Sequence, residues 1–182
     1  MEFPALASLD VSSLRWWKTR DSPTEFRLSA GDAPVLVLRW PSNGGSTATG
    51  ESAAGSWAIA RAGFLNPRLL ARSAEPPTSL GRLSVHLSHH VIDVAGGGSY
   101  RFHRAGLLLP AWKVVGAANE ECLHIEPVRE GRTLAGGAVI VAPTAAKRPE
   151  LVLLLALTWT FITLAWFEDE ALVPFEDRNV GP

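Results

Sequence analysis

The residues of this 182-residue chain whose types and spacing best suit chemistry lie in the segment HLSHHVID, residues 86–93. His86, His89, His90 and Asp93 offer three imidazoles and one carboxylate, and these groups are usual protein ligands of zinc and iron. On a helix, the spacing i, i+3, i+4, i+7 would place all four on one face. The segment is therefore the best candidate for a metal site, provided that it forms a helix.

The sequence around this segment favours a strand instead. Apolar and polar residues alternate in RLSVHL, residues 82–87, which is the period of a half-buried strand. On a strand, His86 and His90 would point to one face, and His89 and Asp93 to the other. We therefore expect solvated histidines, with a metal site at these four residues as the alternative, and we expect no cofactor.

Arginines form a second candidate site. Between residues 57 and 104 only Glu75 and Asp93 oppose six arginines, which are Arg61, Arg68, Arg72, Arg82, Arg101 and Arg104. If neighbouring strands bring them together, they would form an anion-binding patch for lipid headgroups or for the carboxylates of a protein partner. The alternative is that each arginine lies singly on the solvent-exposed face of its strand.

The composition narrows the function classes. Acidic and basic side chains nearly cancel, at a formal net charge of -1, so we expect no nucleic-acid partner. The single Cys122 excludes an internal disulfide framework and any multi-cysteine zinc site, and we expect it to be a small buried residue. The chain contains no GxSxG elbow, CxxC pair, Walker loop or dinucleotide fingerprint. The sequence therefore predicts no catalysis, unless the fold gathers an active site from distant residues.

The N-terminal residues bear on localisation. The segment MEFPALASLDVSSL has no basic region and carries Glu2 and Asp10, so it does not have the pattern of a secretory signal. We expect a cytoplasmic protein, and peripheral contact with a membrane would be compatible with that location.

Short alternating runs, separated by Gly, Pro, Asn and Ser, predict an antiparallel β structure over most of the chain. The segment 41–55, PSNGGSTATGESAAG, is polar and of low complexity, and we expect a mobile surface loop there. The candidate strands are residues 14–20, 25–29, 35–40, 57–62, 68–73, 82–87, 90–94, 99–104, 112–115, 122–126 and 138–142.

The segment 151–167, LVLLLALTWTFITLAWF, is free of charge, glycine and proline. Its apolar residues cover every direction of a helix, so either lipid or the protein itself must surround it. As a helix it would be about 26 Å long at 1.5 Å per residue, slightly short of a bilayer core. We expect an N-terminal arm at 1–13, one domain at 14–173 with the helix near 148–170, and a polar tail at 174–182.

Four stretches together resemble the tubby C-terminal-like superfamily, which includes the LURP-one-related proteins and the phospholipid scramblases. They are WAIARAGFLNPRLLARS at 57–73, SYRFHRAGLLLPAWKVV at 99–115, the candidate strand 122–126, and RPELVLLLALTWTFITLAW at 148–166. The resemblance implies a mainly β fold, a closed antiparallel barrel of about twelve strands, too wide to be filled by its own side chains alone. The hydrophobic C-terminal helix would fill its centre. The basic residues with which tubby contacts phosphoinositides have no one-to-one match here, so lipid binding does not follow from the resemblance.

The sequence thus predicts a binding or scaffold module that recognises anionic lipid headgroups or an acidic protein partner. Two alternatives stay open. In the first, the segment 151–167 anchors the protein in a membrane; in the second, the barrel mouth carries a small ligand or an active site.

Overall fold

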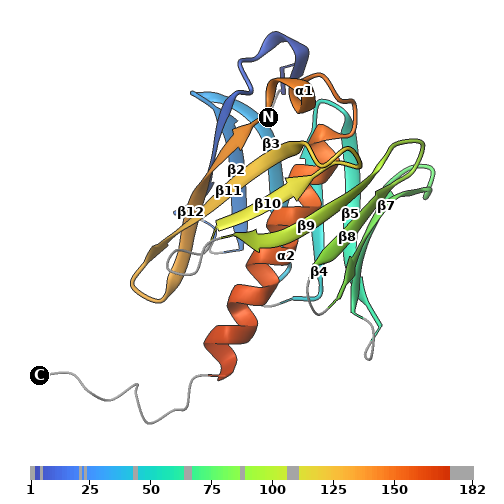
Figure 1. The fold of residues 1–182 in the computed structure, drawn as a ribbon. Coiled ribbons are helices and arrows are strands. Elements are labelled where there is room, and N and C mark those ends of the chain that lie inside the picture. The colour runs from blue at the N-terminus through green and yellow to red at the C-terminus, as the bar shows by residue number, and fades with distance from the viewer. Residues whose placement is uncertain are drawn as a thin grey trace, which may run out of the picture.

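The structure is a computed structural model that describes residues 3–4, 6–20, 22, 24–42, 45–63, 67–86, 89–105 and 111–172, with only the backbone of residues 7 and 168–172. Twelve antiparallel strands form a closed barrel, and the long C-terminal helix runs through its centre (Figure 1). This confirms the predicted mainly β fold, the closed barrel and the enclosed helix.

The strands follow one another around the wall. They are β1 (Ser13–Lys18), β2 (Glu25–Ala30), β3 (Ala33–Arg39), β4 (Thr47–Ser52), β5 (Gly55–Ala62), β6 (Arg68–Ser73), β7 (Ser79–Val85), β8 (His90–Val94), β9 (Ser99–Ala105), β10 (Ala111–Val115), β11 (Glu121–Glu130) and β12 (Thr133–Val141). The helices are the 3-10 turn η1 (Leu6–Ser8), α1 (Pro143–Ala146) and α2 (Leu151–Leu172). Each strand pairs with its neighbours in sequence, and β1 pairs with β12 to close the barrel.

The up-and-down order gives the barrel two distinct ends. The odd-numbered strands end, and the even-numbered strands begin, where α2 leaves the barrel, and we call this the exit end. The indole N–H of Trp166 in α2 donates to the carbonyl of Arg132 in the β11–β12 turn, at 2.9 Å. The opposite end, where α1 and the start of α2 lie, is the cap end (Figure 1).

Alternation along each strand places one set of side chains against α2. In β1, Leu14 and Trp16 are buried while Arg15 and Trp17 are exposed. Most of α2 is buried up to Leu164, including the polar Thr158, Thr160 and Thr163. The barrel therefore supplies the apolar surroundings that a helix without a polar face requires.

The segment 41–55 does not form the expected mobile loop throughout. Residues Thr47–Ser52 are β4, paired with β3 on one side and β5 on the other. Its inward positions are small, and a Cβ atom at Gly50 would lie 2.3 Å from the indole nitrogen of Trp57. The small residues that suggested a loop are therefore required by the packing. Trp57 on β5 lies opposite Gly50, and its large side chain leaves no room for a side chain at that position.

The helix and the terminal segments differ in detail from their predicted bounds. Helix α2 begins at Leu151, three residues later than expected, and the short α1 precedes it. The expected N-terminal arm is partly packed on the barrel, because Val11 is buried and Leu6 and Leu9 pack against the core. The expected tail at 174–182 lies outside the described residues. Cys122 is buried, as predicted.

Candidate functional site

The six arginines that form the predicted site divide into two groups. Arg61 at the end of β5, Arg68 at the start of β6 and Arg104 near the end of β9 are exposed at the exit end. The backbone N–H of Arg61 donates to the carbonyl of Ser46, and Arg61 has a further interaction.

The other three arginines lie on the outer wall, nearer the cap end. Arg82 forms an ion pair with Asp93 at 2.7 Å, and this pairing, joined by a hydrogen bond from Ser99, lowers the pKa of the Asp93 carboxyl. Arg101 donates to the side-chain carbonyl of Asn119. Arg72 is exposed on β6, opposite Ser79 of β7. The six therefore do not form one patch, and two of the wall arginines already have acceptors.

More basic residues join Arg68 and Arg104 at the exit end. We define the basic rim as five exposed arginines, of which none makes a side-chain hydrogen bond or ion pair with another described residue: Arg20, Arg68, Arg104, Arg129 and Arg132. Arg129 and Arg132 belong to the β11–β12 hairpin, and the others come from the β1–β2 turn, β6 and β9, so the rim occupies four places around the barrel. Only Glu130 is an exposed acid among the described residues of these strand ends and connections.

The cap end has the opposite tendency. Its connections carry the exposed acids Asp10, Asp32 and Glu75, against the exposed base Lys147. Among the described strand ends and connections of the barrel wall, bases therefore prevail at the exit end and acids at the cap end. Sequence reasoning did not include Arg20, Arg129 and Arg132 in the patch because they lie outside the arginine-rich segment 57–104 and have acids beside them, such as Glu130.

Aromatic side chains lie inside the rim, where α2 leaves the barrel. Phe161, Trp166 and Phe167 are partly exposed. Phe161 packs edge-on against Trp112 of β10, with ring centroids 5.5 Å apart. Beyond Phe167 the α2 backbone continues to Leu172, and this last part contains Glu168, Asp169 and Glu170 in its sequence. The exit end thus combines arginines, aromatic rings and a short acidic helical segment.

The fold separates Asp93 from the three histidines of the predicted alternative metal site. His90 begins β8 and lies beside Phe161, with ring centroids 4.4 Å apart, whereas Asp93 lies on the outer wall with Arg82. His86 and His89 flank the β7–β8 connection, and their rings stack at 5.8 Å. Within the described part of the chain, no group of three or more His, Cys, Asp or Glu residues has a geometry that could hold a metal ion.

His90 is an uncharged histidine inside the exit end. Burial lowers its pKa from 6.5 to about 4, and the charges of His86 and His89 contribute to the shift. Its ring lies between Phe102, Trp112 and Phe161, and its Nδ1 atom has no hydrogen-bond partner among the described residues. Protonation would therefore place a charge in an aromatic environment.

We expect the free energy of unfolding to fall as the pH drops from 6.5 to about 4. The unfolded chain binds a proton at His90 in this window and the folded chain does not, so the loss grows toward the folded pKa. The ring is partly exposed, which reduces the loss to about 1 to 2 kcal/mol. Urea denaturation of the wild type and of His90→Phe at several pH values measures this difference. Parallel pH profiles for the two proteins would contradict the expectation.

A second polar cluster fixes the start of α2 at the cap end. Arg148 donates to the hydroxyl of Tyr100 at 2.8 Å and forms an ion pair with Glu120 at 2.7 Å. Tyr100 in turn donates to Glu150. Burial and the Glu150 carboxylate raise the pKa of Tyr100, and the hydrogen bonds to Tyr100 and Glu120 raise the pKa of Arg148. These groups serve one another as partners, so we assign the cluster a structural role.

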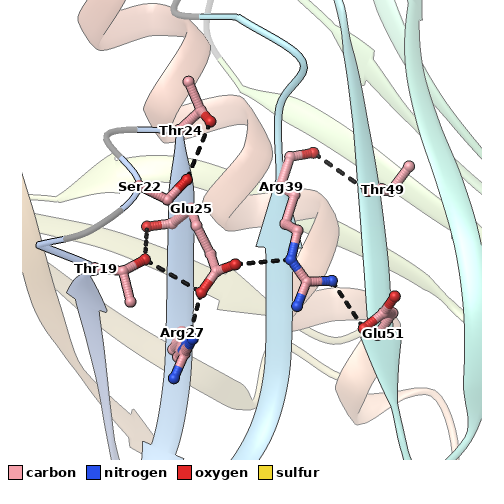
Figure 2. Close-up of polar contacts among 8 residues, drawn as sticks. All are labelled: Thr19, Ser22, Thr24, Glu25, Arg27, Arg39, Thr49 and Glu51. Carbon is pink, nitrogen blue, oxygen red and sulfur yellow. Dashed lines mark hydrogen bonds and ion pairs between the residues drawn. The ribbon is translucent and has the colours of Figure 1, made fainter. Parts of the chain in front are cut away.

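A third polar cluster lies on the outer wall of β2, β3 and β4. The Glu25 carboxylate accepts hydrogen bonds from the Nε atoms of Arg27 at 2.6 Å and Arg39 at 2.7 Å, and Arg39 also pairs with Glu51 at 2.8 Å (Figure 2). Thr19 donates to Glu25 from the end of β1. Burial alone would raise the pKa of Glu25, but the bonds from Arg39 and Arg27 outweigh it, so the pKa is lowered.

The variant Glu25→Gln is expected to lower the free energy of unfolding by about 1 to 3 kcal/mol at neutral pH, because two arginines lose the carboxylate between them. Because the pKa of Glu25 is lower in the folded chain than in the unfolded chain, this stabilisation is fully present above the pKa of the unfolded chain. It is lost as the pH falls through the pKa of the folded chain. Chemical denaturation at neutral and acidic pH measures it. Glu121→Gln is the matched control, since its pair with Lys113 is more exposed. Equal losses in the two variants would contradict the assignment.

No protein-family model, curated protein or solved structure matches this chain. None of the described helices combines the length and apolar character needed to cross a membrane.

Proposed function

We propose that the protein is a non-catalytic binding module that docks the exit end of its barrel on an anionic lipid surface. The basic rim is the observation that carries this proposal. Its five arginines are exposed, they occupy four places around the barrel, and none forms an ion pair with another described residue. Charges spread around the end of a barrel suit a planar array of headgroups better than a single small anion.

The energetic scale supports a peripheral contact. A basic side chain near an anionic membrane contributes about 1 kcal/mol, so the five rim arginines together give an upper bound of about 5 kcal/mol. The partly exposed Trp166 and Phe167 add aromatic side chains of the kind that favour the headgroup region. The sequence that joins β9 to β10 also contains Leu107, Leu108 and Leu109, although these residues lie outside the described part of the chain.

The acids at the end of α2 oppose such docking. Glu168, Asp169 and Glu170 follow Phe167 in the helix, and an anionic surface would repel them. They would keep the affinity low and sensitive to salt. The variant Glu168→Gln, Asp169→Asn, Glu170→Gln is therefore expected to bind anionic vesicles more tightly than the wild type, as measured by co-sedimentation. Unchanged or weaker binding would argue against an approach by the exit end.

We also propose, as part of this assignment, that the chain belongs to the tubby C-terminal-like superfamily. The closed barrel of twelve strands around a hydrophobic C-terminal helix supports that membership, because it is the architecture that the resemblance implied.

Vesicle co-sedimentation with matched charge reversals tests the proposed docking. Arg68→Glu with Arg104→Glu changes β6 and β9 at the exit end, and Arg72→Glu with Arg101→Glu changes the same two strands on the wall. At about 1 kcal/mol per charge, the first pair should weaken binding to phosphatidylserine-containing vesicles more than tenfold, and the second pair much less. Binding should also fall with added salt, which screens exposed charges.

The controls separate the lipid surface from other anions. Vesicles of phosphatidylcholine alone should not bind. Equal losses from both pairs would show that no particular end docks, and absence of binding to anionic vesicles would overturn the proposal. Binding to polyglutamate without binding to vesicles would instead favour an acidic protein partner.

A further inference from the structure

A hollow of about 360 Å³ lies on the outer wall over β1, β2 and β3, and none of its lining residues belongs to the basic rim. Trp17 of β1, Arg27 and Ser29 of β2, Asp32 of the following turn and Pro34 of β3 line it. Its volume is within the range of small-molecule sites, which combine apolar walls with a few placed polar groups. Trp17 is 40% exposed, an unusual degree for so large an apolar side chain in this protein.

Arg27 is held in position for a ligand. Its Nε atom donates to Glu25, which is only 7% exposed and is itself fixed by Arg39 and Thr19 (Figure 2). The guanidinium carbon lies over the ring of Trp17, 5.4 Å from the centroid. Among the described residues, no acceptor bonds to the two terminal nitrogens of Arg27. The planar guanidinium of Arg27 is thus held in place, and its terminal nitrogens can still donate hydrogen bonds. Such a group is suited to bind a carboxylate through two parallel hydrogen bonds.

The charges around the hollow favour a single negative charge on the ligand. Arg15 is exposed on β1 directly opposite Ser29, so a second guanidinium stands beside the lining. Asp32 lies in the lining and would repel a doubly charged group such as a phosphate monoester. Glu25 already shares the charge of Arg27. A monoanion therefore matches the site better than a dianion.

We infer that this hollow binds a flat carboxylate, with the carboxylate on the terminal nitrogens of Arg27 and the apolar body against Trp17 and Pro34. The flat face of the indole, with the apolar proline ring nearby, suits a planar body such as an aromatic ring. The carboxylate of the ligand would replace water at the Arg27 guanidinium. Because Glu25 already holds this side chain in one position, binding costs little side-chain entropy.

Titration with benzoate tests the inference, followed through the indole N–H signal of Trp17 in a two-dimensional NMR spectrum and assigned with Trp17→Phe. We expect saturable shifts in the millimolar range for benzoate. Benzamide, which has the same shape without the charge, and acetate, which has the charge without the ring, should each bind at least fivefold more weakly. Phenyl phosphate should also bind more weakly because of Asp32.

Variants locate the binding site. Arg27→Lys keeps the charge and removes the fork, and Arg101→Lys makes the same change at an arginine outside the hollow. The first should weaken benzoate binding at least fivefold and the second should leave it unchanged. If Arg27→Lys disturbs folding, Trp17→Leu removes the aromatic wall without touching the Glu25 bonds. Because this variant also removes the Trp17 signal, binding to it and to the wild type is compared through the line broadening of the benzoate ring protons, and the loss should be comparable. Equal binding of benzoate and benzamide, no saturation, or equal effects of the two lysine variants would overturn the inference.

Discussion

The variant Leu155→Asp is expected to leave the chain unable to form a soluble, folded barrel. Leu155 is 0% exposed in the middle of α2, and the wall surrounds it with apolar side chains. A buried charge without a partner costs several kcal/mol, and a domain of this kind has a total stability of about 5 to 15 kcal/mol. Soluble yield and the thermal unfolding transition followed by circular dichroism measure the effect.

The matched control for this variant is Ala165→Asp, because Ala165 lies on the same helix and is partly exposed near the exit end. An aspartate there can reach water, so the protein should stay folded with a smaller loss of stability. A soluble Leu155→Asp protein with an unchanged melting temperature would show that position 155 faces solvent, and the enclosed helix would then be wrong. Deletion of residues 150–182 should act like Leu155→Asp because the barrel would lose its core.

The second large effect is expected for Trp159→Ala, with a loss of about 3 to 5 kcal/mol in the free energy of unfolding. Trp159 is fully buried, stacks on Trp16 with ring centroids 5.0 Å apart, and meets Phe26 edge-on at 5.6 Å. A Cβ atom at Gly137 of β12 would lie 2.9 Å from its ring, so the wall is shaped around the indole. The alanine variant would leave a cavity that the closed wall cannot collapse to fill.

Packing is the cause of this second effect, because the indole N–H of Trp159 has no acceptor among the described residues. Urea denaturation measures the loss. Trp166→Ala is the control, since Trp166 is partly exposed and its indole makes one hydrogen bond, to the carbonyl of Arg132. We expect a loss of about 1 kcal/mol there. Similar losses in the two variants would mean that Trp159 does not organise the core.

Local patterns predicted the elements of this fold well. The alternation in residues 57–62 and 68–73 predicts strands that the structure confirms at β5 and β6. The uniform apolar segment 151–167 predicts the buried helix for the same local reason, because an all-round apolar surface needs an apolar environment. These predictions succeed because side-chain direction in a strand or helix depends only on spacing along the chain.

The strand β4 was missed because its residues gain their conformation from neighbours. Ala48 and Gly50 carry little strand propensity, and pairing with β3 and β5 on both sides stabilises the extended backbone. The ion-pair cluster around Glu25 was missed for a related reason. Arg39 and Glu51 are far from Glu25 in sequence, and only the register that places Arg39 opposite Glu25 brings them into the cluster.

The β class and the alternation of the strands could be predicted from local periodicity, and the all-round apolar surface of residues 151–167 showed that this helix needs apolar surroundings. Only the tertiary structure decided that the barrel supplies them. The tertiary structure alone decided which charges share an end of the barrel. In an up-and-down barrel every strand reverses the chain, so the eleven predicted strands, without β4, would place Arg20 at one end and Arg68 and Arg104 at the other. The twelfth strand restores the direction of all later strands, and the basic rim exists only because the closed barrel includes it.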